Sequence, residues 1–392
     1  MPESSVYLDH AATTPVRPEV LEAMLPYLKA AAFGNPSSSH KFGRTARAGL
    51  EQARREVAEA VGAEPSQVFF TSGGTEADNL AIIGSALAAR DQGKPMLAVV
   101  TAIEHKAILA AAHAVCHLGG QERILPVGTD GVVDLEALDR ILAERPAVVS
   151  VMWVNNEIGT VQPVAELARR CLAAGAAFHT DGVQAFGKVP IAFSDLSCSM
   201  LTLSGHKIGG PKGIGALVIQ DRRLLESILH GGGQQFGVRP GTENVPGAVA
   251  FGAASRLAAA EQAAEAVRLA GLRDELLARL RAAIPDLVVN AESGPRAPHI
   301  LSIAIPGAEN EAMLMHLDMQ GVAASGGSAC STGAVEPSHV LTAIGVPREL
   351  ALSALRLSLG HESTMADVER VVAVFPKIVD RVRTLAGVLG RG

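Results

Sequence analysis

The fold class of this chain is decided by residues 68–101, which read VFFTSGGTEADNLAIIGSALAARDQGKPMLAVVT. An apolar run at 68–71 is followed by a glycine pair, a helical pattern at 76–92 and a second apolar run at 96–101. The alternation continues outward, with strand-like runs at 148–153, 177–180, 200–203 and 215–219 and helical patterns at 44–61 and 164–174. This alternation predicts an α/β fold with a mostly parallel sheet, which binds ligands where its strands end and helices begin.

The last third of the chain has a different pattern, which predicts a second and smaller unit of the α+β class. A long helix rich in Ala, Leu, Arg and Glu is expected over 253–283, with an interruption near Gly271. After it come a strand near 300–305, a helix at 310–320 and a closing helix at 365–385. We therefore predict a large domain at 16–258 and a small domain made of 1–15 and 259–392.

The composition excludes several classes of protein. Of the 392 residues, 48% are hydrophobic and 19% charged, a balance that favours a folded core over disorder. The 34 Lys and Arg against 40 Asp and Glu leave a net charge of −6, which excludes a polybasic nucleic-acid binder. The four cysteines show no CxxC pair and no Cys–His ligand spacing, so that neither a disulfide framework nor a metal site is expected. The sequence shows neither a leader pattern nor an apolar window of ~18 residues. We therefore expect a cytoplasmic protein that binds no membrane.

The glycine pair of the opening stretch stands where a strand leads into a helix. In TSGGTE, residues 71–76, free backbone amides at the helix start would form a cradle for an anion beside Gly74 and the hydroxyl of Thr75. This pattern indicates a phosphate site, although an ordinary helix cap would use the same residue types. It is not a Walker loop, because GxxxxGK[ST] is absent.

A lysine stands at the end of another predicted strand, in SGHKIGGPKG at residues 204–213. A lysine at a strand end with bare glycine backbone around it is typical of one that forms a Schiff base. Lys207 is the first candidate for that role, and Lys212, five residues further on, is the competing one. Ser204 and His206 could bind the same anion as the cradle at 71–76.

An acidic residue follows the strand at 177–180, in HTDGVQ at residues 179–184. The carboxylate of Asp181 could keep a heteroaromatic nitrogen protonated, and the amide of Gln184 could donate to a ring oxygen. Asp181 as a helix cap is the simpler alternative. Together with Lys207, the pattern predicts pyridoxal phosphate as the cofactor.

One cysteine differs from the other three in its surroundings. Cys330 lies in SGGSACSTG, residues 325–333, where glycines and small side chains predict a mobile loop and an accessible thiol. For Cys116, Cys171 and Cys198 we expect the usual state of a free cysteine, a small buried hydrophobe.

Motifs along nearly the whole chain carry a family resemblance. In order they are YLDHAATTP, FGNPSS, TSGGTEADN, EHKA, VNNEIG, HTDGVQ, SGHKIGGPKGIG, RPGTEN, SACSTG, EPSHVL and RLSLG. The sequence resembles the cysteine desulfurases of the class V aminotransferase superfamily, and its cysteine loop at about 323–336 is similar to the long loop of the housekeeping and nitrogen-fixation group. The resemblance implies the pyridoxal-phosphate-dependent transferase fold, like that of aspartate aminotransferase, with the cysteine loop on the small domain.

The resemblance also implies which residues hold the cofactor. Lys207 would bind pyridoxal phosphate covalently, Asp181 would pair with its pyridine nitrogen, and Gln184 would contact its phenolic oxygen. His105 would stack on the ring and transfer protons. The remaining contacts would come from Gly74, Thr75, Asn156, Ser204, His206 and, across a homodimer with shared active sites, the partner subunit's Thr242.

For the substrate, L-cysteine, the resemblance implies a carboxylate site made by Asn35, Asn156 and Arg356. Lys207, His105 and Cys330 would be catalytic, giving L-alanine and a persulfide on Cys330. The sulfur would then pass to an acceptor such as an iron–sulfur scaffold protein, or toward thio-cofactor synthesis. A selenocysteine lyase and a class V aminotransferase would share the cofactor residues, and an inactive scaffold-binding partner is the alternative that is not an enzyme. The cysteine loop favours the desulfurase.

Overall fold

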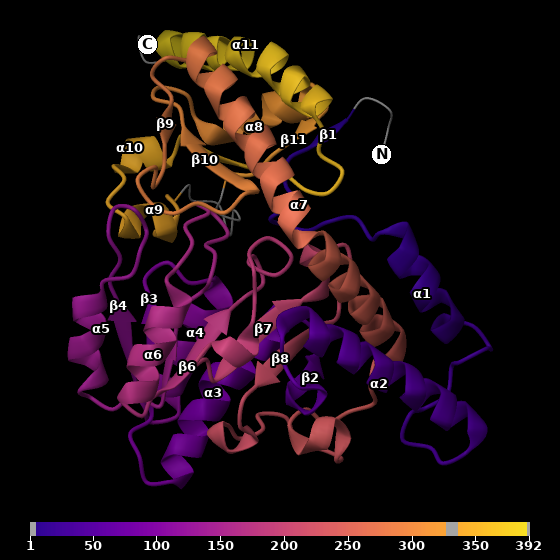
Figure 1. The fold of residues 1–392 in the computed structure, drawn as a ribbon. Helices are drawn as coiled ribbons and strands as arrows, with labels where there is room; N and C mark the ends of the chain where they lie inside the picture. The colour runs from indigo at the N-terminus through magenta and orange to yellow at the C-terminus, as the bar shows by residue number, and fades with distance from the viewer. Residues whose placement is uncertain (1–4, 327–335, 390–392) are drawn as a thin grey trace.

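The protein is built around a seven-stranded sheet, shown in Figure 1 as part of a computed structural model that describes residues 5–326 and 336–389. The strand order is β2 (Val68–Thr71), β8 (Gly215–Ile219), β7 (Met200–Ser204), β6 (Ala177–Asp181), β5 (Val148–Ser150), β3 (Leu97–Thr101) and β4 (Gln121–Leu125). β8 runs antiparallel to both β2 and β7, whereas the pairs from β7 through β4 are parallel. The predicted α/β fold with a mostly parallel sheet is confirmed.

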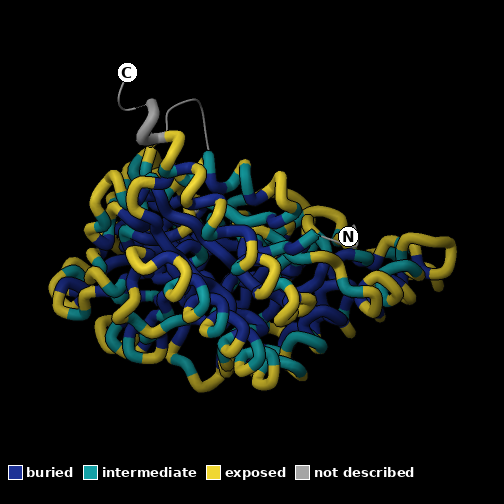
Figure 2. Tube along the Cα trace, turned by 90° about the horizontal axis from the view of Figure 1, so that it is seen from above, coloured by how far each residue is buried: buried dark blue, intermediate teal, exposed yellow. Residues whose placement is uncertain are grey.

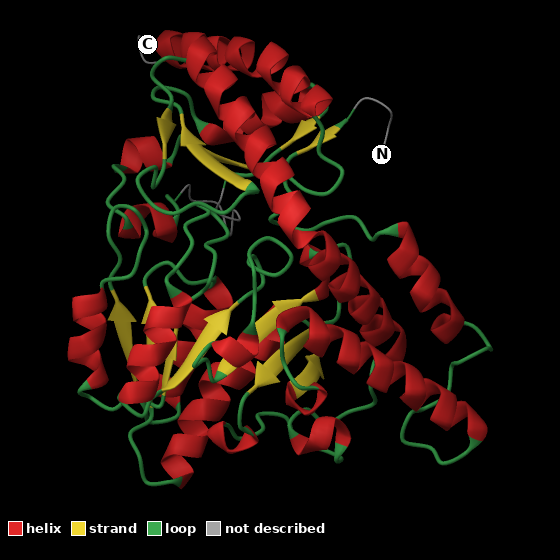
Figure 3. Cartoon of the chain, viewed as in Figure 1, coloured by secondary structure: helices red, strands yellow, loops and turns green. Residues whose placement is uncertain are grey.

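Helices cover both faces of this sheet, because its strands carry apolar side chains on both. Successive residues of a strand point to opposite faces. Phe69 packs with α3 (Gly74–Asp91) and α4 (Lys106–His117), whereas its neighbour Phe70 packs in the cluster on the other face. That second face is covered by α2 (Lys41–Val61), α5 (Leu135–Leu142), α6 (Val164–Ala173) and the first part of α7 (Val245–Ala283). Figure 3 shows the strands between these helices, and Figure 2 shows that the buried segments lie in the interior of the molecule.

A second hydrophobic cluster joins the start of the chain to its last third, and lies above the large sheet in Figure 1. It contains a three-stranded antiparallel sheet of β12 (Ala354–Ser358), β10 (Ile300–Ala304) and β9 (Val288–Val289), and a parallel pair of β1 (Val6–Tyr7) and β11 (Val322–Ala323). Helices α8 (Asn310–Met319) and α11 (Met365–Leu389) pack against these strands. The shorter helices are α1 (Pro18–Leu28), α9 (His339–Ala343) and α10 (Arg348–Ala351).

Helix α7 connects the two clusters as one continuous element. Ala254 packs with the large sheet, and Leu269 packs in the second cluster. The predicted interruption near Gly271 is wrong, because one glycine costs a helix only ~1 kcal/mol and the helix is packed on both sides of it. The predicted domain boundary between residues 258 and 259 falls inside this helix and stays a prediction.

Strand β4 was not predicted, because it lies at the edge of the sheet and carries polar residues in place of an apolar run. Over the described ranges, none of the helices has both the length and the apolar content needed to cross a membrane.

Candidate active site

A cavity of about 940 Å³ opens where the parallel strands end and face the second cluster. Its walls come from segments that are far apart in the sequence, from Ala11 near the start to Arg356 in β12. The size is within the usual range for a site that binds a small molecule. Most of the predicted site residues line it, namely Gly74, Thr75, His105, Asn156, Asp181, Gln184, Ser204, His206, Lys207 and Arg356.

Lys207 lies one short 3-10 turn, Gly205–Lys207, beyond the end of β7. Its ammonium group donates hydrogen bonds to the carbonyl oxygens of Ala11 and Ala12, the latter at 2.7 Å. Burial, assisted by the charge of Arg356, lowers the pKa of Lys207 to about 8. More of this amine is therefore neutral and nucleophilic near neutral pH than in an ordinary lysine. Lys212, the competing candidate, is exposed and lies outside the cavity lining.

The turn that carries Lys207 is held by the segment at the start of the chain. Thr14 donates from its backbone and its hydroxyl to the carbonyl of His206, both at 2.9 Å, and its hydroxyl accepts from the amide of Gly209. The amide of Gln184 donates to Ala11 O at 2.8 Å, so that the same segment also fixes Gln184. The YLDHAATTP motif thus positions the lysine rather than contributing a reactive side chain.

Asp181 is buried at the end of β6, with its carboxylate accepting from the amide of Val183 at 2.9 Å. Burial raises its pKa, and the charges of His105 and Lys207 oppose that rise. Asp78, on the second turn of α3, is a second buried carboxyl in the cavity wall. Burial and the neighbouring Asp181 raise the pKa of Asp78 well above its usual value. Asp78 was not predicted as a site residue, although it follows the TSGGTE stretch by two residues.

The predicted phosphate cradle is formed by the start of α3 and the end of β7. Gly73 caps the helix with φ 152°, a conformation that side chains rarely permit, and the first two residues of α3 line the cavity. Gly74, Thr75 and the buried Ser204 line the same part of the cavity. Burial first, and then the charges of two nearby lysines, lower the pKa of His206 to about 4. The cradle therefore consists of neutral donors and a helix N-terminus, a set suited to a phosphate group.

Arg356 reaches the opposite wall of the cavity from β12. Its guanidinium donates to Asn156 O at 2.8 Å and to the carboxylate of Asp9 at 2.7 Å, and its side chain is only 6% exposed. Within the described residues its Nε has no hydrogen-bond partner. A fixed guanidinium with spare donor capacity in a cavity is suited to bind a carboxylate.

His105 is the N-cap of α4, where its Nδ1 accepts from the amide of Ala107 at 3.2 Å. This bond leaves the other ring nitrogen as the proton donor when the ring is neutral. Burial lowers the pKa of His105, and the negative charge of Asp181 opposes that effect. Glu104, which precedes it, was not predicted; it is fully buried, accepts from Thr101 at 2.7 Å, and has its pKa raised to about 8 by burial.

Three predicted residues are not placed in the cavity wall. Asn35 and Thr242 are exposed, and the carboxamide oxygen of Asn35 accepts from the amide of Ser37 at 2.9 Å. Cys330 lies outside the described residues. Gly326 and Glu336, which stand on either side of the undescribed segment, both line the cavity.

The cavity combines three features: Lys207 just beyond β7, the buried Asp181 at the end of the neighbouring strand β6, and the start of α3. This combination defines an enzyme that uses pyridoxal phosphate. The family described as Aminotransferase class-V matches residues 6–371, and this chain belongs to it.

Named relatives agree with this assignment. The chain is 42% identical over 381 residues to a cysteine desulfurase IscS of Dictyoglomus turgidum, with 97% of this chain and 96% of that protein covered. It is 47% identical over 386 residues to a cysteine desulfurase of Cereibacter sphaeroides, covering 97% of each. A solved structure described as a NifS-like protein superposes with a TM-score of 0.88 at 33% identity, covering 96% of this chain and all of that one.

Pyridoxal phosphate is the cofactor of this family, and the residues present fit it. The cradle of neutral hydroxyls and helix amides suits its phosphate, and the amine of Lys207 suits its aldehyde. The buried carboxyl of Asp181 offers an acceptor for the proton on its ring nitrogen.

Proposed function

We propose that the protein is a cysteine desulfurase that converts L-cysteine to L-alanine and takes up the sulfur as a persulfide on Cys330. The proposal is carried by one observation: Lys207, Asp181 and Arg356 face a single cavity, and residues on both sides of the Cys330 segment line that cavity too.

Each described side chain has a defined part in binding the cofactor. When bound, pyridoxal phosphate supplies an electrophilic carbon and a ring that withdraws electrons from an attached amino acid. The start of α3, with Thr75, Ser204 and His206, would bind the phosphate group. Lys207 would hold the aldehyde carbon covalently, Asp181 would hold the proton of the ring nitrogen, and His105 would contact the ring.

The substrate is oriented from the opposite wall. Arg356 and Asn156 bind the carboxylate of L-cysteine, and the pair of Arg356 with Asp9 keeps the guanidinium in place. Lys207 would be the base that removes the proton at the substrate Cα, because its lowered pKa leaves more of the amine neutral than in an ordinary lysine. His105 moves further protons within the cavity.

Cys330 accepts the sulfur atom. Its thiolate attacks the substrate sulfur, the carbon–sulfur bond breaks, and the electron pair of that bond stays with the substrate carbon, which is then protonated. L-Cysteine and one enzyme thiol are consumed, and L-alanine and one enzyme persulfide are formed, so that atoms and electrons balance.

The test is a product analysis. Protein incubated with L-cysteine should release L-alanine, and peptide mass spectrometry should place one extra sulfur on the peptide that contains Cys330. Cys330→Ser should keep its cofactor absorption and carry no persulfide. Release of alanine by that variant at the wild-type rate would overturn the role of Cys330. A keto acid in place of alanine would indicate an aminotransferase, and turnover of selenocysteine alone a selenocysteine lyase.

We further propose that the enzyme is a cytoplasmic homodimer that passes its sulfur to an acceptor protein, such as an iron–sulfur scaffold. The dimer is supported by the exposed position of Thr242 outside the cavity of its own chain, which leaves this residue available to a partner. Near Asn35, the rings of Phe33 and Phe42 contact each other in a tilted arrangement with 5.4 Å between their centroids, and the two residues are 62% and 50% exposed. Exposed aromatic pairs of this kind are typical of an interface.

A further inference from the structure

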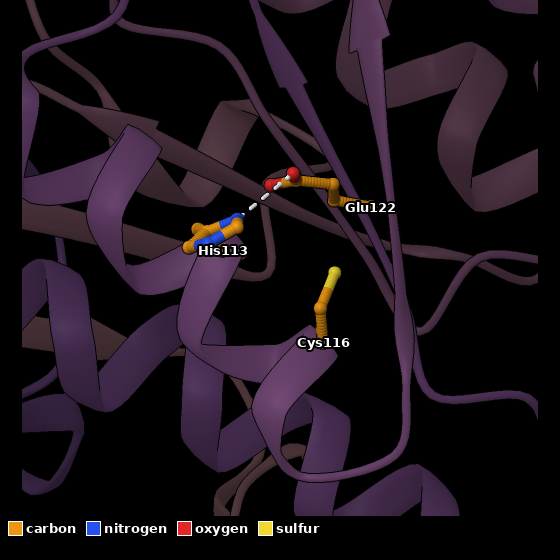
Figure 4. Close-up of side chains that lie close together, drawn as sticks. All are labelled: His113, Cys116 and Glu122. Atoms are coloured by element: carbon orange, nitrogen blue, oxygen red, sulfur yellow. Dashed lines mark hydrogen bonds and ion pairs between the residues drawn. The ribbon is translucent and has the colours of Figure 1, made fainter.

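Three side chains that can bind a metal ion converge at the edge of the large sheet, outside the active-site cavity. His113 and Cys116 lie on α4 and Glu122 lies on β4, and one ligand atom of each lies within 4.8 Å of the other two. Figure 4 shows the three side chains directed into the same space between the helix and the strand. None of the three belongs to the cavity lining, and the proposed desulfurase chemistry uses none of them.

The local fold brings the three residues together in a fixed arrangement. His113 and Cys116 are three positions apart on α4, which places them on the same side of the helix. The helix ends at His117, two residues before Gly119, whose φ of 88° turns the chain. The amide of Gly120 closes the turn by donating to Val115 O at 3.0 Å. Strand β4 begins at once and pairs with β3, so that Glu122 lies beside the last turn of the helix.

The contacts of the cluster leave its ligand atoms accessible. Nδ1 of His113 lies 3.2 Å from a carboxylate oxygen of Glu122, with 64% of the His113 side chain and 31% of the Glu122 side chain exposed. Cys116 is half-buried, so the expectation of a buried cysteine is wrong for Cys116, while Cys171 and Cys198 are buried as predicted. Cys116 is therefore less shielded from solvent than Cys171 and Cys198. His117 lies on the same face, with its ring centroid 4.9 Å from that of His113.

The donor set selects the class of metal. An imidazole nitrogen, a thiolate sulfur and a carboxylate oxygen together suit Zn²⁺, whereas Mg²⁺ and Ca²⁺ prefer oxygen donors alone. We propose that His113, Cys116 and Glu122 form a Zn²⁺ site at the edge of the sheet, with a fourth position open to His117 or water. Binding requires the Cys116 thiol to release its proton to solvent as the metal–sulfur bond forms. The expectation of no metal site rested on cysteine spacing, and the fold supplies the third donor from a neighbouring strand.

The test measures how fast Cys116 is alkylated in the complete enzyme with its cofactor. Iodoacetamide labelling of the Cys116 peptide, read by mass spectrometry, should slow when Zn²⁺ is added to the wild type. His113→Ala and Glu122→Gln keep the thiol and lose a ligand, and should need at least about tenfold more Zn²⁺ for the same protection. His316→Ala and Glu136→Gln, which remove the same side-chain types elsewhere on the surface, should behave as the wild type.

Two results would overturn the site. One is alkylation of Cys116 at the same rate with and without Zn²⁺ in the wild type. The other is protection that persists unchanged in both ligand variants, which would place the metal elsewhere. Cys171 and Cys198 are buried, so their continued resistance to alkylation reports that each variant is folded.

Discussion

At the scale of single residues, the charge state of Lys207 is the property that the site controls most directly. Burial first and Arg356 second lower the pKa of this lysine to about 8, while Asp181 and Asp9 act in the opposite direction. An amine attacks an aldehyde only in its neutral form, so the reactive fraction grows as the pH rises through that pKa.

We therefore expect cofactor uptake by the cofactor-free protein to accelerate with pH and to level off above about pH 9, where an ordinary lysine with a pKa of about 10.4 would still be gaining reactivity. Stopped-flow absorbance of the bound cofactor measures the rate. Arg356→Gln removes a charge that lowers the pKa of Lys207, and its profile should shift to higher pH. A wild-type rate that keeps rising beyond pH 10 would contradict the lowered pKa.

The two buried carboxyls of the cavity, Asp78 and Asp181, should differ in their charge state. Burial and the neighbouring Asp181 raise the pKa of Asp78 well above its usual value. We therefore expect Asp78 to keep its proton while Asp181 carries the charge. Asparagine resembles a protonated aspartate and cannot replace an ionised one. Asp181→Asn should lower kcat by about a hundredfold or more, and Asp78→Asn by less than about tenfold, measured as alanine release. Equal losses in the two variants would contradict this division of charge.

Among the helices and strands, those most accurately predicted from the sequence are the strands that are covered on both faces of the sheet. Strands β2 and β8 match their predicted ranges, because a strand covered on both faces appears as a continuous apolar run. Lys207 and Asp181 could be predicted because they stand at strand ends. Asp78 and Glu104 could not, because no pattern along the chain shows which helix and loop residues the fold turns toward a cavity.

Two glycines of helix α7 should respond in opposite ways to replacement by alanine. A Cβ on the exposed Gly271 would meet nothing within 4 Å, so Gly271→Ala should raise the free energy of unfolding by about 0.5–1 kcal/mol. A Cβ on Gly252, earlier in the same helix, would lie 2.8 Å from Cα of Ala53, and Gly252→Ala should destabilise the protein. Urea unfolding of the two variants measures both effects. A Gly271→Ala variant less stable than the wild type would indicate that the helix needs a break there.

At the scale of the whole molecule, the start of the chain joins the two clusters. β1 pairs with β11 in the second cluster, and the residues that follow it bond to the turn that carries Lys207. Asp9, between these contacts, pairs with Arg356. Lys207 and Arg356, which line the same cavity, are thus held by one segment, and a displacement of that segment would alter both.

The proposed dimer can be tested through Thr242, which is exposed and does not line the cavity of its own chain. If the partner subunit's Thr242 binds the phosphate group, Thr242→Ala should weaken cofactor retention by about tenfold, the usual effect of one hydrogen bond to a charged group. Mixed dimers of Thr242→Ala chains with Lys207→Ala chains then contain one site with both residues intact. Cofactor retention and alanine release should return in the mixture, to about the level of one wild-type site per mixed dimer. If Thr242 served the cavity of its own chain, every site in the mixture would lack one of the two residues, and neither property would recover.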